Sequence, residues 1–205
     1  MRPTFTIHAG EYLVGTKIDA SFPGLRVWVP SSDTGIDLLV TDAQQEKVAS
    51  LQVKFSKDYL GTSKSSAPIP SIVSGGWWKL NRSKLAASIA DYWVLVLYQF
   101  QTRQFDFVVI PPGELLARYD HRGVRTDIIQ SYFGVSGGRC WETRGLGKAD
   151  LQKISEGTHV NRHREFTRDL NAWPFPVGGA NQRLHLTAAA VTSRQVETLP
   201  CGRRK

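Results

Sequence analysis

Residues 35 to 56, GIDLLVTDAQQEKVASLQVKFS, carry the pattern around which the rest of the chain is interpreted. This stretch holds two short apolar runs, 36–40 and 51–55, with a polar segment between them. Runs of this length around polar turn residues are typical of two paired strands. Asp37 opens the first strand as an acid among aliphatic residues, and Gln52 and Lys54 share one face of the second. The stretch therefore predicts that an acid and a Gln-x-Lys pair meet in space.

The composition is that of a soluble globular protein. The chain has 205 residues, of which 41% are hydrophobic and 21% charged, enough for one domain with a proper core. No apolar run approaches the roughly 20 residues that cross a bilayer, so we expect no membrane contact. The first residues, MRPTFTIHAGEYLV, have no signal-peptide core, which favours a cytoplasmic location. Cys140 and Cys201 match neither a disulfide framework nor a zinc site.

The net charge is +8, and it divides the chain into two parts. Residues 177–205 carry five basic side chains and one acid, and therefore half of that charge. We expect a single domain over residues 1–176 and a basic, flexible tail over 177–205 with no catalytic role. The domain itself is only mildly basic, which permits a nucleic-acid partner without requiring one.

The remaining patterns predict a layered α/β or α+β arrangement. Expected helices are 4–20, 82–90, 111–119, 150–155 and 162–173, and further strands are 25–29, 92–100 and 105–110. Residues 128–133 fit a helix or a strand edge, whereas 56–76 and 134–139 are predicted loops. Short connections make 25–29, 36–42 and 50–56 an antiparallel meander. A crossover through 82–90 can then return 92–100 parallel to its neighbour.

Four residues in this order resemble the motif of the PD-(D/E)XK nuclease superfamily. They are Glu11 in AGEYLVG, Asp37 in GIDLLV, and Gln52 and Lys54 in LQVKF. The resemblance covers roughly the first half of the chain and is strongest to small bacterial members that share an E…GIDL…QVK pattern. Mrr-type restriction enzymes and Holliday-junction resolvases are more distant relatives. The resemblance implies a restriction-endonuclease-like three-layer core, with a mixed central sheet of about five strands flanked by helices.

The same resemblance implies a Mg²⁺-dependent endodeoxyribonuclease, with Mn²⁺ as a substitute. Such a hydrolase cuts DNA phosphodiester bonds in restriction, repair or junction resolution, and we expect a homodimer because two copies cut two strands. The implied metal ligands are Asp37, Glu11, Gln52 and the main-chain carbonyl of Val53, since Mg²⁺ prefers hard oxygen donors. Lys54 is implied to orient or help deprotonate the attacking water and to offset charge in the transition state.

Gln52 departs from the pattern, because the superfamily usually places a carboxylate there. An amide oxygen can bind a hard cation but brings no charge, so weaker metal affinity follows. Two other interpretations stay open. One is a catalytically inactive nucleic-acid-binding or partner-binding module on the same fold. The other is an unrelated small α/β protein in which Asp37 caps a turn, Lys54 lies at a sheet edge and Glu11 reaches solvent.

Three neighbours of these residues have simpler roles. His8 lies one turn before Glu11, and a structural hydrogen bond at the helix start is its expected role. Asp33 and Asp42 are possible replacements for Asp37, but both lie in turns, where aspartate is common.

Nucleic-acid contacts are expected from the segment after the second strand. The candidates are Lys57, Lys64, Trp77, Lys79, Arg82 and Lys84. Basic loops and helix starts hold phosphates, and an exposed tryptophan can stack on a base. Of the pair Trp77 and Trp78, at least one is expected in the core. A second basic group has no predicted position: Arg139, Arg144, Arg162 and Arg164.

Overall fold

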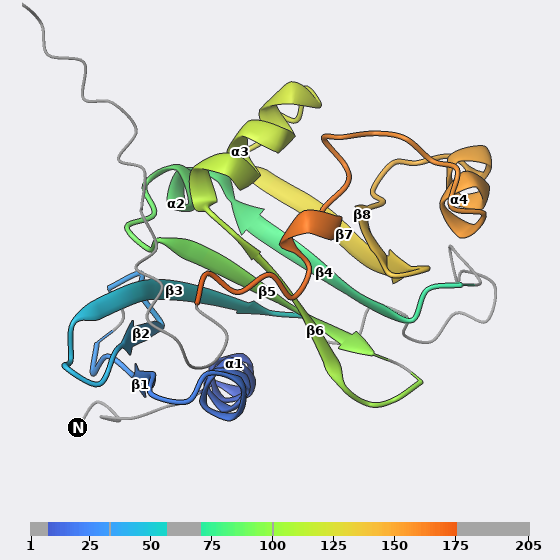
Figure 1. Cartoon of the computed structure of the whole chain (residues 1–205). Helices are drawn as coiled ribbons and strands as arrows, with labels where there is room; N and C mark the ends of the chain where they lie inside the picture. Colours follow the sequence, from blue (N-terminus) through green and yellow to red (C-terminus); the bar gives the residue numbers. More distant parts are fainter. Residues whose placement is uncertain (1–7, 33, 57–70, 100, 176–205) are drawn as a thin grey trace, which may run out of the picture.

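The computed structural model describes residues 8–32, 34–56, 71–99 and 101–175, which form a mixed α/β domain (Figure 1). Its elements are α1 (Ala9–Ser21), β1 (Arg26–Trp28), β2 (Leu38–Thr41), β3 (Lys47–Phe55), β4 (Ser74–Asn81), α2 (Arg82–Ala86), β5 (Tyr92–Gln99), β6 (Phe105–Ile110), α3 (Pro112–His121), β7 (Ile128–Ser136), β8 (Arg139–Glu142), α4 (Lys148–Ser155) and the 3-10 turn η1 (Thr167–Asp169). The expected tail, 177–205, lies outside the described residues. Within the described ranges, no helix has the length and apolar character needed to cross a membrane.

The strands form one curled mixed sheet. Its order is β1-β2-β3-β5-β4-β7-β8, with β6 paired to β5 off this path. The antiparallel meander of β1, β2 and β3 is confirmed, and so is the parallel pairing of β3 with β5. The sheet has eight strands, where the sequence predicted about five. The difference comes from β4, β7 and β8, which the sequence placed in loops or left ambiguous.

The sheet forks at β5. Val96 pairs with both β3 and β6, and Tyr98 pairs with both β4 and β6. Both β3 and β4 therefore lie on the edge of β5 opposite β6, one after the other. Ser56, just after β3, joins the two branches, because its hydroxyl accepts from Trp77 N and donates to Trp77 O, both at 2.8 Å. The end of β3 thus lies against the middle of β4.

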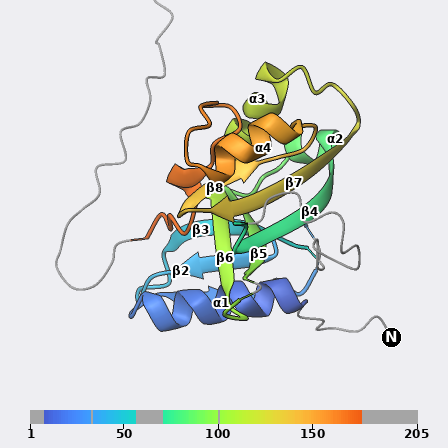
Figure 2. The ribbon, with the colours of Figure 1, turned by 90° about the vertical axis from the view of Figure 1, so that its right-hand side faces the viewer.

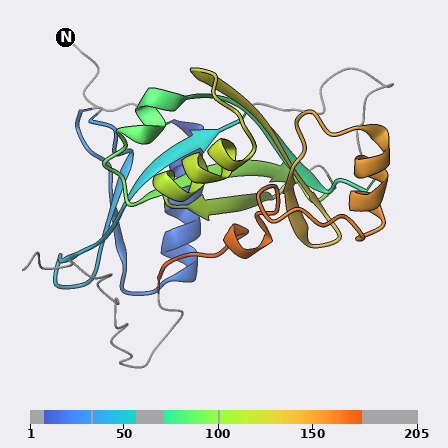
Figure 3. The same cartoon turned by 90° about the horizontal axis from the view of Figure 1, so that it is seen from above.

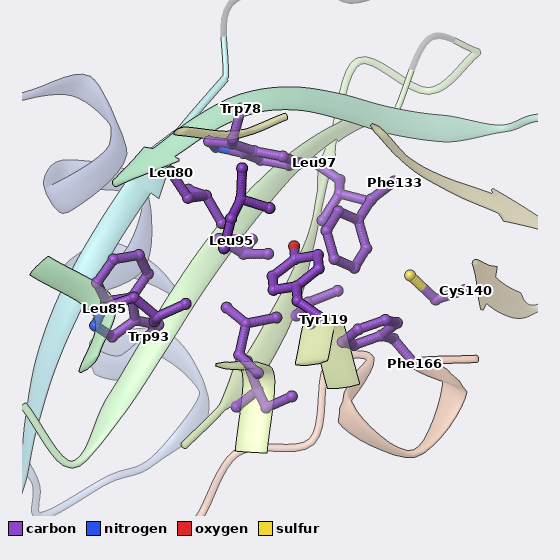
Figure 4. Packing of buried hydrophobic residues seen from close by; sticks show 14 of the residues in the cluster. Trp78, Leu80, Leu85, Trp93, Leu95, Leu97, Tyr119, Phe133, Cys140 and Phe166 are labelled. Carbon is purple, nitrogen blue, oxygen red and sulfur yellow. The ribbon is translucent and has the colours of Figure 1, made fainter. Parts of the chain in front are cut away.

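Strand β5 is buried on both faces, as its apolar run predicts. Trp93, Leu95 and Leu97 enter a core cluster that also contains residues of α2 and α3, shown in Figure 4. Val94 and Val96 enter a second cluster, which contains Val14 and Ile18 of α1. Figures 2 and 3 show the resulting layers: α1 covers one face of the sheet, and α2 and α3 lie on the other.

The expected loops at 56–76 and 134–139 are wrong in part. Ser74–Asn81 is strand β4, and the hairpin between β7 and β8 turns only at Gly137 and Gly138, both with positive φ. Two adjacent glycines suit a tight hairpin turn. Glycine residues also made the start of β4 look like a loop in the sequence. In the structure, Gly76 makes room for a neighbouring ring, because a Cβ there would lie 2.2 Å from the Trp78 ring. Gly76 is therefore a packing residue rather than a loop signal.

The expected helix at 162–173 is also wrong, since only η1 forms there. Tertiary contacts on both sides of η1 pair single residues of this segment with the sheet, and residues 162–164 form a turn. Glu165 forms a β-bridge with Trp141, and Leu170 forms one with Val108. The apolar residues at helical spacing therefore reach different parts of the sheet instead of one face of a helix.

Candidate active site

One cleft collects the four residues of the sequence motif. It has a volume of about 540 Å³. Its lining residues are His8, Ala9, Gly10, Glu11, Asp37, Gln52, Val53, Lys54 and Phe55. They come from the start of α1, from the residue that precedes β2, and from the second half of β3. Side chains from three separate pieces of backbone thus share one hollow.

Asp37 is held in place by the pairing of β2 with β3. Its backbone N–H donates to the Leu51 carbonyl at 2.8 Å, which continues the β2–β3 ladder by one residue. Its Oδ2 accepts from Gln52 Nε2 at 2.6 Å and from Val53 N at 2.7 Å. Both bonds end on the same oxygen, so Oδ1 accepts no hydrogen bond from the described residues. That oxygen keeps its lone pairs for another ligand.

Glu11 reaches the cleft because α1 begins very close to β3. A Cβ on Gly10 would lie 2.6 Å from the Cβ of Phe55, so a residue without a side chain is needed at this contact. The Oε2 of Glu11 accepts from the His8 backbone N at 3.1 Å and caps the first turn of α1. This bond comes from the main chain of His8, so the role expected of the histidine side chain stays a prediction. Glu11 itself is half-buried.

Lys54 is oriented by aromatic residues of the next strands. Its Nζ lies 5.2 Å from the centroid of the Trp93 ring, a cation–π distance. Its backbone carbonyl accepts from Trp78 Nε1 at 3.1 Å. Sequence reasoning missed the role of Trp93. Trp93 is the register partner of Gln52 across the parallel pair, which only the strand pairing reveals.

The oxygen donors in the cleft are of the type that a hard divalent cation prefers, although they are few in number. Glu11 and Asp37 offer carboxylate oxygens, and Gln52 offers a neutral amide oxygen once its nitrogen is turned towards Asp37, as it is here. Among the described residues, no group of three or more His, Cys, Asp or Glu side chains is placed to hold a metal. A cation in the cleft would therefore depend on Gln52 and on a main-chain carbonyl as well as on two acids.

Of the two alternative acids, Asp42 does not replace Asp37. Oδ1 of Asp42 accepts from the backbone N of Gln44 at 3.0 Å and of Glu46 at 2.9 Å, so Asp42 stabilises the turn before β3. Asp33 lies outside the described residues.

The expected nucleic-acid residues are only partly brought together. Lys57 and Lys64 lie outside the described residues. Trp77 is 37% exposed, whereas Trp78 is in the core, as expected for one of the pair. Lys79 lies over the Trp77 ring, 5.3 Å from its centroid.

The two remaining candidates lie at the start of α2. Arg82 is bound internally, since its Nη1 lies 2.7 Å from Asp120 Oδ1 and its Nη2 donates to the Val124 carbonyl. Its charge is therefore largely committed to the fold. Lys84 is exposed on α2.

The second basic group is dispersed. Arg139 pairs with Glu165 at 3.0 Å and lies over the Trp141 ring. Arg162 lines a larger hollow of about 680 Å³ beside α3, where its Nε donates to His163 at 3.1 Å. Charged groups there are bound to one another, as in the 2.6 Å pair of Arg118 and Glu114, so this hollow belongs to the packing of α3. The other two arginines line a different cavity.

A scan against protein-family models, a search of curated proteins and a search of solved structures each returned no match for this chain. The function is therefore argued from the residues of the cleft and their geometry.

Proposed function

We propose that this protein is a Mg²⁺-dependent endodeoxyribonuclease of the PD-(D/E)XK type, which hydrolyses phosphodiester bonds of DNA. One observation carries the proposal: Glu11, Asp37, Gln52 and Lys54 line a single cleft. Nothing in their separation along the chain requires this, because helix α1 and two strands must pack correctly to bring them together.

The arrangement of the elements adds support. Helix α1 lies against β3, the strands β1, β2 and β3 form an antiparallel meander, and β5 returns parallel to β3. This arrangement is consistent with the mixed central sheet flanked by helices that the resemblance implies. On this proposal, β4, β7 and β8 form an added branch beyond that core.

Each residue of the cleft has a defined task in such a reaction. Asp37 Oδ1, Glu11, the Gln52 amide oxygen and the Val53 carbonyl would hold the Mg²⁺ ion. When bound, the cation neutralises phosphate charge and makes a water molecule more acidic. Lys54 positions the attacking water and offsets the charge that develops on the phosphate. The Trp93 ring beneath its ammonium group limits the directions in which Lys54 can point.

A second candidate function rests on the hydrogen bonds of Asp37. Gln52 Nε2 and Val53 N both satisfy Oδ2, so the pair is stable without any cation. That arrangement favours a nucleic-acid-binding module that has lost catalysis. One measurement distinguishes the two functions: the nuclease cleaves DNA when metal is present, and the binding module does not.

The test is the nicking of supercoiled plasmid by the full chain in millimolar Mg²⁺, with EDTA in a parallel reaction. We expect nicking that EDTA abolishes and that Asp37→Ala lowers by at least about a hundredfold. Lys54→Ala should lower the rate by a similar factor. Because Asp19 is an exposed acid of α1 outside the cleft, Asp19→Ala should cleave as the wild type does. No nicking, or equal nicking by Asp37→Ala, would reject the nuclease.

A further inference from the structure

A cationic cavity lies at the start of β7, away from the cleft. Its volume is about 460 Å³. Among the described residues, its lining includes Arg122, Arg125, Arg144 and Arg164 but no aspartate or glutamate. Arginine guanidinium groups bind phosphate oxygens in bidentate fashion. A hollow lined by several of them and by no acid is suited to an anionic ligand.

The carboxylates around this cavity do not balance its charge. Glu142 is shared by Arg122 and Arg164, at 2.5 and 2.8 Å. Asp120 is shared by Arg82 and Arg125, at 2.7 and 3.2 Å. Arg144 donates to the neutral hydroxyl of Tyr132 at 2.9 Å. Four of these five guanidinium groups line the cavity, and over the described ranges their ion pairs reach two carboxylates, those of Glu142 and Asp120.

Two further observations point to a missing acceptor. Arg122 lines the cavity, and its Nε is buried with no hydrogen-bond partner in the described part of the chain. Burial raises the pKa of Glu142. It therefore disfavours the ionised carboxylate that would balance the charge of these arginines. A buried donor without an acceptor is costly, and an anionic oxygen would relieve it.

An aromatic row runs from this cavity along β4 and β7. Trp77 and Tyr132 are register partners, with ring centroids 6.2 Å apart. Lys79 lies over the Trp77 ring at 5.3 Å, and Arg144 lies over the Tyr132 ring at 5.2 Å. The two rings of the row therefore lie between two cations, Lys79 at one end and Arg144 at the other. Arg144 belongs to both the row and the cavity.

The row also leads towards the cleft. Trp77 is bonded through its backbone to Ser56, which closely follows Lys54 in the chain. The neighbouring Trp78 donates to the Lys54 carbonyl. One continuous chain of contacts therefore joins the cavity, the two rings and the strand that carries Lys54.

We propose that the β4–β7 face binds an unpaired nucleic-acid strand, with a base stacked on Trp77 and Tyr132 and a backbone phosphate in the arginine cavity. Aromatic rings interleaved with cations are the usual platform for single strands, because every base has a π-face. In an intact duplex the bases are already stacked and cannot reach these rings. The binding of a strand depends only on the residues of this face. That the bound strand is also the substrate rests on the proposed function.

The experiment is fluorescence anisotropy of a labelled single-stranded DNA 12-mer with the full chain in EDTA, over a series of salt concentrations. We expect affinity that falls with salt and exceeds the affinity for the matching duplex. Trp77→Ala and Arg144→Ala should each weaken binding by about tenfold or more. Arg144→Ala should also reduce the slope of log affinity against log salt by about 0.7.

Arg26→Ala and Trp28→Ala are the matched controls, because both exposed residues lie on β1, at the opposite end of the sheet. They should bind the 12-mer as the wild type does. Lys79→Ala changes an exposed strand position and gives a second test if Arg144→Ala unfolds, and it should weaken binding by several fold. Equal affinity in wild type, Trp77→Ala and Lys79→Ala, or preference for duplex, would overturn the inference.

The plasmid assay separates this inference from the nuclease. Strand binding that depends on Trp77 without any metal-dependent cleavage would support the binding face and reject the nuclease. Cleavage that depends on Asp37, together with strand binding unaffected by Trp77→Ala and Arg144→Ala, would support the nuclease and reject the binding face.

Discussion

At the residue scale, the contact between Gln52 and Asp37 distinguishes a metal site from a stable polar pair. Gln52→Glu replaces the donor at 2.6 Å with a second carboxylate. Without metal, we expect a loss of about 1–2 kcal/mol at pH 7, because like charges in contact raise the pKa of the introduced carboxyl group. A raised carboxyl pKa means that stability is lost as the pH rises through it, so the loss should shrink towards pH 4. Thermal unfolding in EDTA measures it.

Millimolar Mg²⁺ should reverse the loss, since a cation between two carboxylates binds the folded state alone. The matched control is Gln152→Glu on α4, where Gln152 Nε2 likewise donates to Glu156 at 2.7 Å, but in an exposed place. There we expect a loss of about 0.5 kcal/mol with no special response to Mg²⁺. Equal effects of Mg²⁺ on the two variants would count against a metal site at Asp37.

At the element scale, the packing of α1 on β3 sets the position of Glu11. Gly10→Ala places a Cβ 2.6 Å from the Phe55 Cβ, an atom close to the backbone that cannot swing away. We expect a loss of about 1–3 kcal/mol in the free energy of unfolding and a displaced start of α1. Urea unfolding measures the first effect, and the cleavage rate in the plasmid assay reports the second.

Gly15→Ala, in the same helix, is the control for helix propensity. Of the described residues, a Cβ there would meet only Val27 within 4 Å, at an ordinary 3.8 Å from its Cγ1. Alanine should therefore raise stability by about 0.5–1 kcal/mol. If both substitutions stabilise the protein, the close approach of α1 to β3 is wrong.

At the scale of the whole molecule, Arg118 ties the segment 164–170 to α3. It is buried, pairs with Asp169 at 2.8 Å and lies over the Phe166 ring at 4.3 Å. Burial raises the pKa of Asp169, whereas Arg118 opposes that rise. Arg118→Met should therefore cost about 3–5 kcal/mol at neutral pH, because it removes the buried partner of Asp169 and leaves that carboxylate with the exposed Arg168, 3.7 Å from Oδ1. Urea unfolding at several pH values measures the cost.

The pH dependence follows from the same pair. Without Arg118 the pKa of Asp169 rises further, so the variant loses stability as the pH rises and recovers part of it near pH 4. Arg168→Met is the control, since Arg168 is 69% exposed and should cost less than about 1 kcal/mol. A pH-independent cost for Arg118→Met would show that lost packing, not the carboxylate without its buried partner, explains it.

Local patterns predicted several elements correctly. The expected helix from residue 82 begins as α2, and the side chain of Asn81 caps it by accepting from Lys84 N at 2.9 Å. Pro112 stands in the first turn of α3, as proline does when it opens a helix. The expected strand 92–100 forms as β5, and it is buried on both faces. Each of these signals depends on residues within about one helical turn of each other.

The errors arose where distant contacts decide the backbone. Residues 162–173 have a helical spacing of apolar residues, yet bridges to Trp141 and Val108 tie two of them to the sheet and only a 3-10 turn forms between these bridges. Gly76 read as a loop residue, although it makes room for the Trp78 ring inside β4. Neither contact is visible in the order of residues, because each partner comes from another strand.

Three features follow from the order of residues alone: the alternation that puts Gln52 and Lys54 on one strand face, the turn at Asp42, and the presence of residue types that bind metals. Three others required the folded chain: α1 brings Glu11 to that strand, Trp93 lies beneath Lys54, and arginines from three separate segments line one cavity. The physical reason is the distance along the chain over which each kind of contact acts. Strand alternation and capping follow from covalent geometry and near neighbours, whereas strand pairing and helix docking depend on burying both faces of one sheet at once.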